Sequence, residues 1–253
     1  MPDHPDPWLE SFRQTALGWL LGPDPPLDRL PSVVFLPMEN PDVYDPAWIA
    51  DHAADLQQCG TLTLATVSGT RLAFSSPKFG APAVAMAVDV FTKAGIKAVV
   101  GVGFCGALQP DVECGDLILP TSALRDEGAS RHYAPGDDPA ACSSRAAGIA
   151  MTAAEEAGLT VTPGPIVSTD GILRETRDKV ERWHAEGRLG VDMETAALYT
   201  VASTFGLDAI ALLIASDNVY LRKQTDLSRL RAGWQSATGL ALAFAAAFRT
   251  APA

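Results

Sequence analysis

Short apolar runs alternate with amphipathic, alanine-rich stretches from residue 33 onward. The apolar runs have the length and the side-chain types of β-strands, and they cover residues 33–37, 61–67, 71–76, 97–103, 116–124, 161–169 and 208–216. The remaining stretches carry apolar residues at helical spacing, at residues 82–95, 143–158, 177–187, 192–205 and 227–248. Strands that alternate with helices predict an α/β fold, a single-domain α/β/α sandwich around a mixed, largely buried central sheet.

Residues 1–32 break this alternation. They are rich in proline and contain one short amphipathic segment that includes Trp8, Leu17 and Leu20. Neither repeats nor low-complexity linkers indicate a second globular unit. We therefore expect an N-terminal arm over residues 1–32 and one domain over residues 33–253.

The net charge limits the kinds of partner that we expect. The formal net charge is -11 and the sequence pI is about 4.7. Such a charge repels phosphate backbones and anionic lipid, so we expect neither nucleic acid nor a membrane surface as partner. The N-terminus lacks a basic region before its apolar residues, and no apolar run is long enough to cross a bilayer, which favours a cytoplasmic protein. The four cysteines form no C-x-x-C pair, so we expect reduced thiols and no metal site.

Three glycines directly after a strand spell a dinucleotide-binding fingerprint. Gly101, Gly103 and Gly106 have the spacing G-x-G-x-x-G, which makes a hydride-transferring enzyme one alternative. That fingerprint must open a helix, whereas here Pro110 and Gly115 precede another strand. The glycines therefore fit a strand end that approaches a ligand closely, or a tight connection between strands.

Two acids lie in apolar surroundings. If a helix begins near Asp192, Glu194 heads a buried stripe with Leu198 and Val201. Its carboxylate would then either be satisfied by the free amides of the first helical turn or accept hydrogen bonds from a polar ligand. Asp217 follows an apolar strand at its carboxyl end, where α/β sheets build binding crevices. It fits either a proton donor of raised pKa or a turn that ends the strand.

The stretch VDMETAALYTVASTFGLDAIALLIASDN, residues 191–218, closely resembles the segment that marks the nucleoside phosphorylase and nucleosidase superfamily. Residues 103–135 and 164–173 resemble further segments of its purine and uridine phosphorylase branch, in the same order along the chain. The resemblance implies a nucleoside phosphorylase-like catalytic domain over residues 33–253. It also implies an enzyme that cleaves the N-glycosidic bond of a nucleoside without a metal or an organic cofactor.

The resemblance assigns roles to residues of this sequence. Glu194 and Met193 would line the ribose, with Glu194 holding its 2′ and 3′ hydroxyls, and Asp217 would protonate the departing base. Cys105 and Gly106 would border the base. Ile172 stands where the family often has a stacking aromatic residue, and the residues by which uridine phosphorylases read uracil are not evident after it, which favours a purine. Because sites of this family borrow residues from a neighbouring subunit, a homo-oligomer is implied.

The residues by which phosphorylases of this family bind phosphate are missing from this sequence. The segment after the first strand, residues 36–45, has no basic residue, Gly101 stands where an arginine is expected, and Phe104 replaces a serine or threonine. A third arginine, expected within residues 59–67, is also missing. Without such cations a phosphate dianion is poorly held.

Three functions remain open from these departures. Charge reasoning favours hydrolysis, with Glu39 or Asp42 activating water as in the acidic loop of the nucleosidases. The second alternative is phosphorolysis that recruits Lys78, Arg125 or Arg131 as cation. In the third, the chain is a binding protein that kept the nucleoside pocket and lost turnover.

Overall fold

The computed structural model describes residues 6–22, 27, 30–39 and 53–251. Within them, ten strands form one sheet: β1 (Val33–Met38), β2 (Ala53–Cys59), β3 (Leu62–Val67), β4 (Thr70–Ser75), β5 (Ala98–Ala107), β6 (Leu117–Asp126), β7 (Ala140–Ala141), β8 (Val161–Thr169), β9 (Gly190–Asp192) and β10 (Asp208–Asn218). The helices are α1 (Pro7–Leu21), α3 (Ala81–Lys93), α4 (Ser144–Glu156), α5 (Arg177–Ala185), α6 (Thr195–Phe205) and α7 (Leu227–Thr250), with short 3-10 turns at η2 (Ser130–His132) and η3 (Ile172–Arg174).

The sheet is mixed and closes partly on itself. Its strands follow the order β10-β6-β8-β9-β5-β1-β4-β3-β2, and β10 also pairs with β5. Strand β1 is parallel to β4 and to β5, and β5 is parallel to β10. In contrast, β6 is antiparallel to β10 and β9 is antiparallel to β5. The carboxyl ends of β5 and β10 therefore lie at the same edge.

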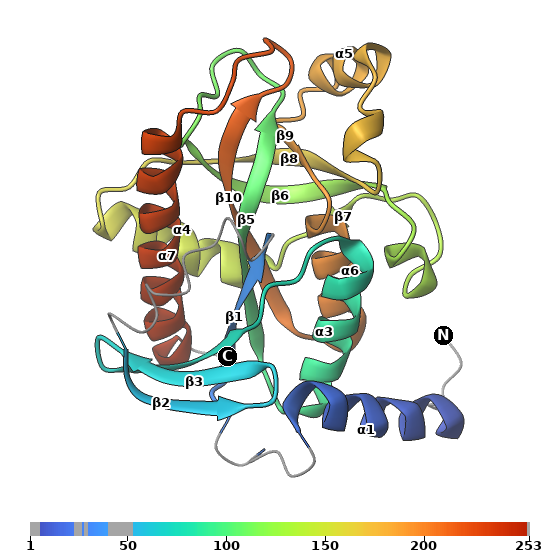
Figure 1. Ribbon diagram of the computed structural model, residues 1–253, viewed down its shortest axis with the longest axis vertical. Coiled ribbons are helices and arrows are strands. Elements are labelled where there is room, and N and C mark those ends of the chain that lie inside the picture. Colours follow the sequence, from blue (N-terminus) through green and yellow to red (C-terminus); the bar gives the residue numbers. More distant parts are fainter. Residues whose placement is uncertain (1–5, 23–26, 28–29, 40–52, 252–253) are drawn as a thin grey trace.

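Helices cover both faces of the sheet (Figure 1). The pair α4 and α7 packs on one face through a core that contains Trp234 and Phe244. The pair α3 and α6 packs on the other face, where Phe91 and Leu198 are fully buried. The predicted α/β/α sandwich with a mixed central sheet is confirmed. No helix of the described part of the chain has both the length and the apolar character needed to span a membrane.

Two strands and one helix start differ from the sequence expectations. The side chains of β2 are mostly exposed and β9 has three residues, so neither shows an apolar run. The helix expected to begin near Asp192 begins at Thr195 instead, with Glu194 at its N-cap position. The reason is that the Asp192 carboxylate accepts the backbone N–H of Thr195 (3.0 Å), which fixes the first turn there.

The helix α1 packs against the rest of the molecule. It buries Leu17, Leu20 and Leu21 in the same apolar core as α3 and α6. Ion pairs join it to α3, with Arg13 Nε 2.8 Å from Asp89 and Lys93 Nζ 2.7 Å from Glu10. The division into an arm over residues 1–32 and a domain over residues 33–253 stays a prediction.

Candidate active site

A cavity of about 350 Å³ lies at the carboxyl ends of β5 and β10. Such edges are where open α/β sheets bind ligands. The described residues that line it are Glu39, Phe79, Phe104, Cys105, Gly106, Ile172, Glu175, Val191, Asp192, Met193, Glu194, Ser216, Asp217 and Val219. The two acids singled out from the sequence, Glu194 and Asp217, thus meet in one space of nucleoside size.

A β-bulge directs Asp217 into this cavity. The pairing of β10 with β5 shifts register between Ala215 and Asp217, so that Asp217 lies opposite Gly106. Bulges of this kind re-aim side chains beside active sites. A Cβ atom at Gly106 would lie 2.3 Å from Val219 Cγ2 and 3.4 Å from Asp217 Oδ1. Glycine is therefore needed at position 106 for the close approach of the Val219 and Asp217 side chains. All three glycines lie inside β5 and do not open a helix, so they do not form a dinucleotide-binding turn.

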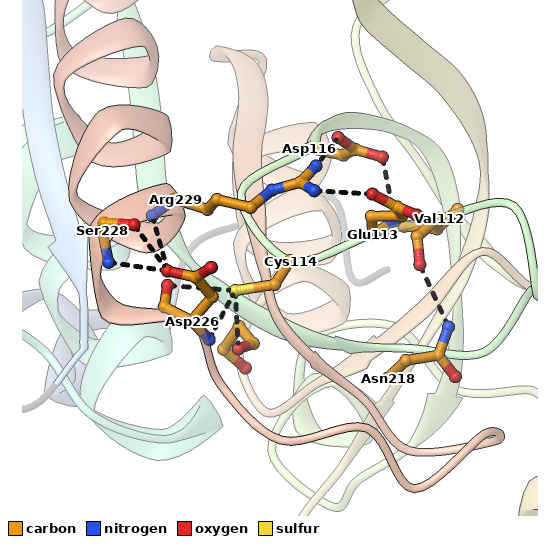
Figure 2. Close-up of polar contacts among 9 residues, drawn as sticks. Val112, Glu113, Cys114, Asp116, Asn218, Asp226, Ser228 and Arg229 are labelled. Carbon is orange, nitrogen blue, oxygen red and sulfur yellow. Dashed lines mark hydrogen bonds and ion pairs between the residues drawn. The ribbon is translucent and has the colours of Figure 1, made fainter.

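The chain that follows Asp217 is anchored to the loop after β5 (Figure 2). The Asn218 amide donates to Val112 O (3.0 Å). It also donates to Gln109 O (2.8 Å). Further along, Arg229 at the start of α7 pairs with Glu113 (2.6 Å). Asp217 thus extends from a strand end whose neighbouring residue is fixed by buried hydrogen bonds, which limits its positions.

Burial sets the protonation of Asp217. Removal of the carboxyl from water raises its pKa above the ordinary aspartate range, and the hydrogen bond from the Ser216 hydroxyl (Oγ to Oδ1, 3.0 Å) opposes this shift. A carboxyl of raised pKa keeps a proton at a higher pH and can act as a general acid.

Glu194 is buried and held by two backbone amides. Its Oε1 accepts the N–H of Gly80 (2.6 Å) and its Oε2 accepts the N–H of Met193 (3.0 Å). Burial and the nearby Asp192 raise its pKa well above the usual range. Each carboxylate oxygen can accept a second hydrogen bond. The side chain therefore has acceptor capacity left for a ligand in the cavity.

Sequence reasoning missed that Asp192 positions Glu194. Its carboxylate accepts from Thr195 N–H and from the Ser168 hydroxyl, which in turn accepts the N–H of Ala196 (2.9 Å). Burial raises the pKa of Asp192 to about 6 against the lowering effect of these hydrogen bonds. This network joins β8, β9 and the start of α6, and so fixes the backbone that presents Glu194. The sequence signal for this network is an aspartate three residues before a threonine, since aspartate side chains often accept backbone N–H groups a few residues further along the chain.

Sequence reasoning also missed Glu175. This residue follows the turn η3 and lines the cavity together with Ile172, Val219 and Asp217. The same four residues also line an outer groove of about 1140 Å³ between α5 and the segment after β10. The cavity therefore opens outward past Ile172, whose side chain is 55% exposed. Nothing in the polar run LRETRD marked Glu175, because its burial arises only from the fold.

Cys105 is not suited to nucleophilic chemistry. The side chain is buried, and burial together with the charges of Asp192 and Asp217 raises the pKa of its thiol well above the ordinary value. A thiol in this state is unreactive. Its role at the site is therefore one of shape, as is that of Gly106.

The cations considered for phosphate lie elsewhere. Lys78 is buried outside the lining of the cavity, and its Nζ donates to the carbonyl (2.8 Å) and the hydroxyl (2.6 Å) of Ser76. Arg125 donates to Ser130 Oγ (2.8 Å), and Arg131 pairs with Asp137 (2.5 Å). The described lining of the cavity contains no lysine or arginine.

The space for one expected arginine is filled by apolar groups. A Cβ atom at Gly101 would lie 2.7 Å from the Met38 thioether and 2.9 Å from Leu198 Cδ2. Of the two acids considered as activators of water, Glu39 lines the cavity, whereas Asp42 lies outside the described residues. Among the residues that the structure describes, no cluster of three or more His, Cys, Asp or Glu side chains is arranged to hold a metal ion.

Comparisons with known proteins agree on one family. Residues 42–248 match a family profile described as the phosphorylase superfamily. A guanosine phosphorylase of Halorubrum lacusprofundi is 33% identical over 160 residues, which cover 63% of this chain and 66% of that protein. A DeoD-type purine nucleoside phosphorylase of Bacillus thuringiensis is 34% identical over 162 residues, which cover 63% and 69% of the two chains. The chain thus aligns with about two thirds of the length of these curated relatives.

Solved structures give the same fold. A crystal structure of a uridine phosphorylase from Vibrio fischeri superposes with a TM-score of 0.75 at 25% identity, and the superposition covers 87% of this chain and 94% of that one. Another crystal structure of that protein, in complex with 6-hydroxy-1-naphthoic acid, covers 92% of this chain with the same TM-score of 0.75.

Proposed function

The chain belongs to the phosphorylase superfamily, and from this premise we propose that it cleaves the N-glycosidic bond of a purine-type nucleoside with phosphate as the acceptor. The family and the enzyme class expected from the sequence are confirmed. The expected preference for hydrolysis finds no support, because the relatives are named phosphorylases. A homo-oligomer and a cytoplasmic location stay predictions.

One observation carries the proposal. Glu194 lines this cavity from the N-cap position of α6, and Asp217 lines it from β10. Cleavage leaves positive charge on the sugar and negative charge on the base, so it needs a group that fixes the pentose and a group that donates a proton to the base. The two acids can supply these two functions from different elements that line one cavity.

The reaction then balances as follows. A phosphate oxygen forms a bond to C1′ while the bond from C1′ to N9 breaks and its electron pair moves into the purine. The protonated carboxyl of Asp217 delivers its proton to N7, so that the base leaves neutral. Glu194 accepts hydrogen bonds from the 2′ and 3′ hydroxyls, while Met193 and Phe104 shield the reacting carbon from bulk water.

The purine preference rests on the resemblance noted in the sequence and on the names of two relatives. Cys105, Gly106 and Ile172 border the space assigned to the base. With an isoleucine at this place, the base packs against an aliphatic surface in place of an aromatic ring. Lys78 serves phosphate binding in this proposal only if its ammonium leaves Ser76.

A nucleoside panel tests the proposal. The purified protein is incubated with adenosine, inosine, guanosine and uridine, with and without phosphate, and free base and ribose 1-phosphate are quantified. We expect purine release only with phosphate, in equimolar amounts with ribose 1-phosphate. Release at the same rate without phosphate assigns water as the acceptor and leaves Glu39 as its activator. Absence of any release leaves the pocket as a binding site and refutes the enzyme.

A further inference from the structure

Glu175 lines the wall of the cavity without a partner among the described side chains. Its carboxyl is partly buried, and it makes no hydrogen bond or ion pair with any described residue. Lys179, one helical turn further on, pairs with Asp126 instead, with Nζ 2.9 Å from Oδ2. A half-buried carboxyl without a protein partner keeps its full capacity for hydrogen bonds. Such a group in a binding cavity is therefore a candidate to receive a hydrogen bond from the ligand.

Charged groups near Glu175 come from β10, from α5 and from the segment after β10, where Arg222 and Lys223 line the same outer groove. Asp217 faces it from β10 and Lys179 faces it from α5, and Arg177 of the outer groove pairs with Glu181 (2.6 Å). Burial, followed by the charge of Asp217, raises the pKa of Glu175 to about 7. Near neutral pH the side chain is therefore present both as a carboxylate, which accepts hydrogen bonds, and as a carboxylic acid, which donates one.

The geometry of a purine limits what this side chain meets. If Asp217 protonates N7, the atoms next to N7 along the edge of the base are C8–H and the substituent at C6. Only the substituent at C6 is strongly polar. A second carboxyl beside Asp217 that touches the base at this edge therefore contacts that substituent. A carboxylate accepts from an amino group there, and a carboxylic acid donates to an oxo group.

We propose that Glu175 is a specificity-determining residue that reads the substituent at C6 of the purine, with its ionised form selecting 6-amino purines and its protonated form selecting 6-oxo purines. This inference rests on the proposed function of the same cavity. It assigns to the turn η3 and the residue after it a function separate from bond cleavage, since Glu175 exchanges no proton with the reacting atoms.

The test compares adenosine and inosine as phosphorolysis substrates between pH 6 and pH 8. The ratio of kcat/KM for adenosine to that for inosine reports the state of Glu175 in the free enzyme, because the titration of Asp217 affects both substrates and cancels. We expect this ratio to rise by up to about a hundredfold over the two pH units in the parent protein, since the ionised fraction rises and the protonated fraction falls by about tenfold each. In E175Q the ratio should be independent of pH.

E181Q is the matched control. Glu181 is a more exposed acid of α5 that lines only the outer groove, so E181Q should keep the pH dependence of the parent. A flat ratio in the parent, or the same slope in E175Q as in the parent, overturns the inference. If E175Q fails to fold, Glu175→Ala is used for the same comparison. Absence of base release from both nucleosides refutes the proposed function itself, which separates that failure from a failure of the specificity role.

Discussion

Asp217 combines three properties of a proton donor at the scale of the single residue. It stands at the carboxyl end of a strand, a bulge turns it toward the cavity, and burial raises its pKa. The neighbouring Asn218 has a different part, because its amide bonds tie the loop after β5 in place. Of these two adjacent residues, Asp217 is suited to proton donation and Asn218 anchors the loop.

We expect Asp217→Asn to lower kcat for a purine nucleoside by about 10²- to 10⁴-fold, the usual contribution of a general acid, with little change in KM. Steady-state kinetics of base release measure this. The donor must be protonated in the free enzyme, so kcat/KM of the parent should fall as pH rises through the raised pKa of Asp217, and the variant should lack this decline. Equal rates in parent and variant would remove Asp217 from the mechanism.

At this scale the sequence revealed Glu194 and Asp217 because an acid among apolar residues contradicts its surroundings. It did not reveal Glu175, which lies in a polar run that is typical of an exposed turn and becomes partly buried only in the fold, where it lines the cavity with Asp217. It also missed that Glu194 precedes its helix, because the bond from Thr195 N–H to the Asp192 carboxylate fixes the first turn of α6 after Glu194.

Among the elements, α1 shows how packing turns a weak sequence signal into structure. Its buried face contacts α3, and its last turn receives the β2–β3 turn, where Thr61 N donates to Leu20 O (2.5 Å). Gly60 in that turn has φ +58, and a Cβ atom there would lie 2.2 Å from Leu20 O. Proline-rich flanks predicted an arm over residues 1–32 but contain no signal for the surface on which it docks. The long apolar strands were predictable, whereas the exposed β2 was not.

Leu21→Ala tests this docking. Leu21 is 2% exposed, so we expect the substitution to lower the free energy of unfolding by about 2–4 kcal/mol, as for other large-to-small changes in cores. Urea denaturation measures it. Leu9→Ala on the same helix is the control, because Leu9 is 46% exposed and should cost no more than about 0.5 kcal/mol. Equal effects of the two substitutions would contradict a docked α1.

Across the whole molecule, the net charge opposes the proposed acceptor. The formal charge of -11 repels a phosphate dianion, and the described lining of the cavity offers no lysine or arginine to offset it. Phosphate therefore approaches against a repulsive field, whereas a neutral nucleoside does not feel it. The composition alone predicted this field, but only the fold showed that Lys78, Arg125 and Arg131 are engaged away from the site.

Added salt should therefore strengthen the binding of phosphate. Raising NaCl from about 20 to about 200 mM shortens the Debye length by roughly threefold, and we expect KM for phosphate to fall about two- to threefold while KM for adenosine stays constant. Initial-rate kinetics with one substrate saturating measure both constants. A KM for phosphate that rises with salt would mean that local cations, supplied from outside the described lining, outweigh the global charge.

The contact between Met38 and Gly101 has a consequence for how this site can change. The Met38 thioether and Leu198 occupy the volume that any side chain at position 101 would enter. Because both contacts are made by the far ends of flexible side chains, a side chain at position 101 requires these two ends to shift. Positions 38 and 101 are therefore expected to couple, so that the effect of a side chain at position 101 on the free energy of unfolding depends on the size of residue 38.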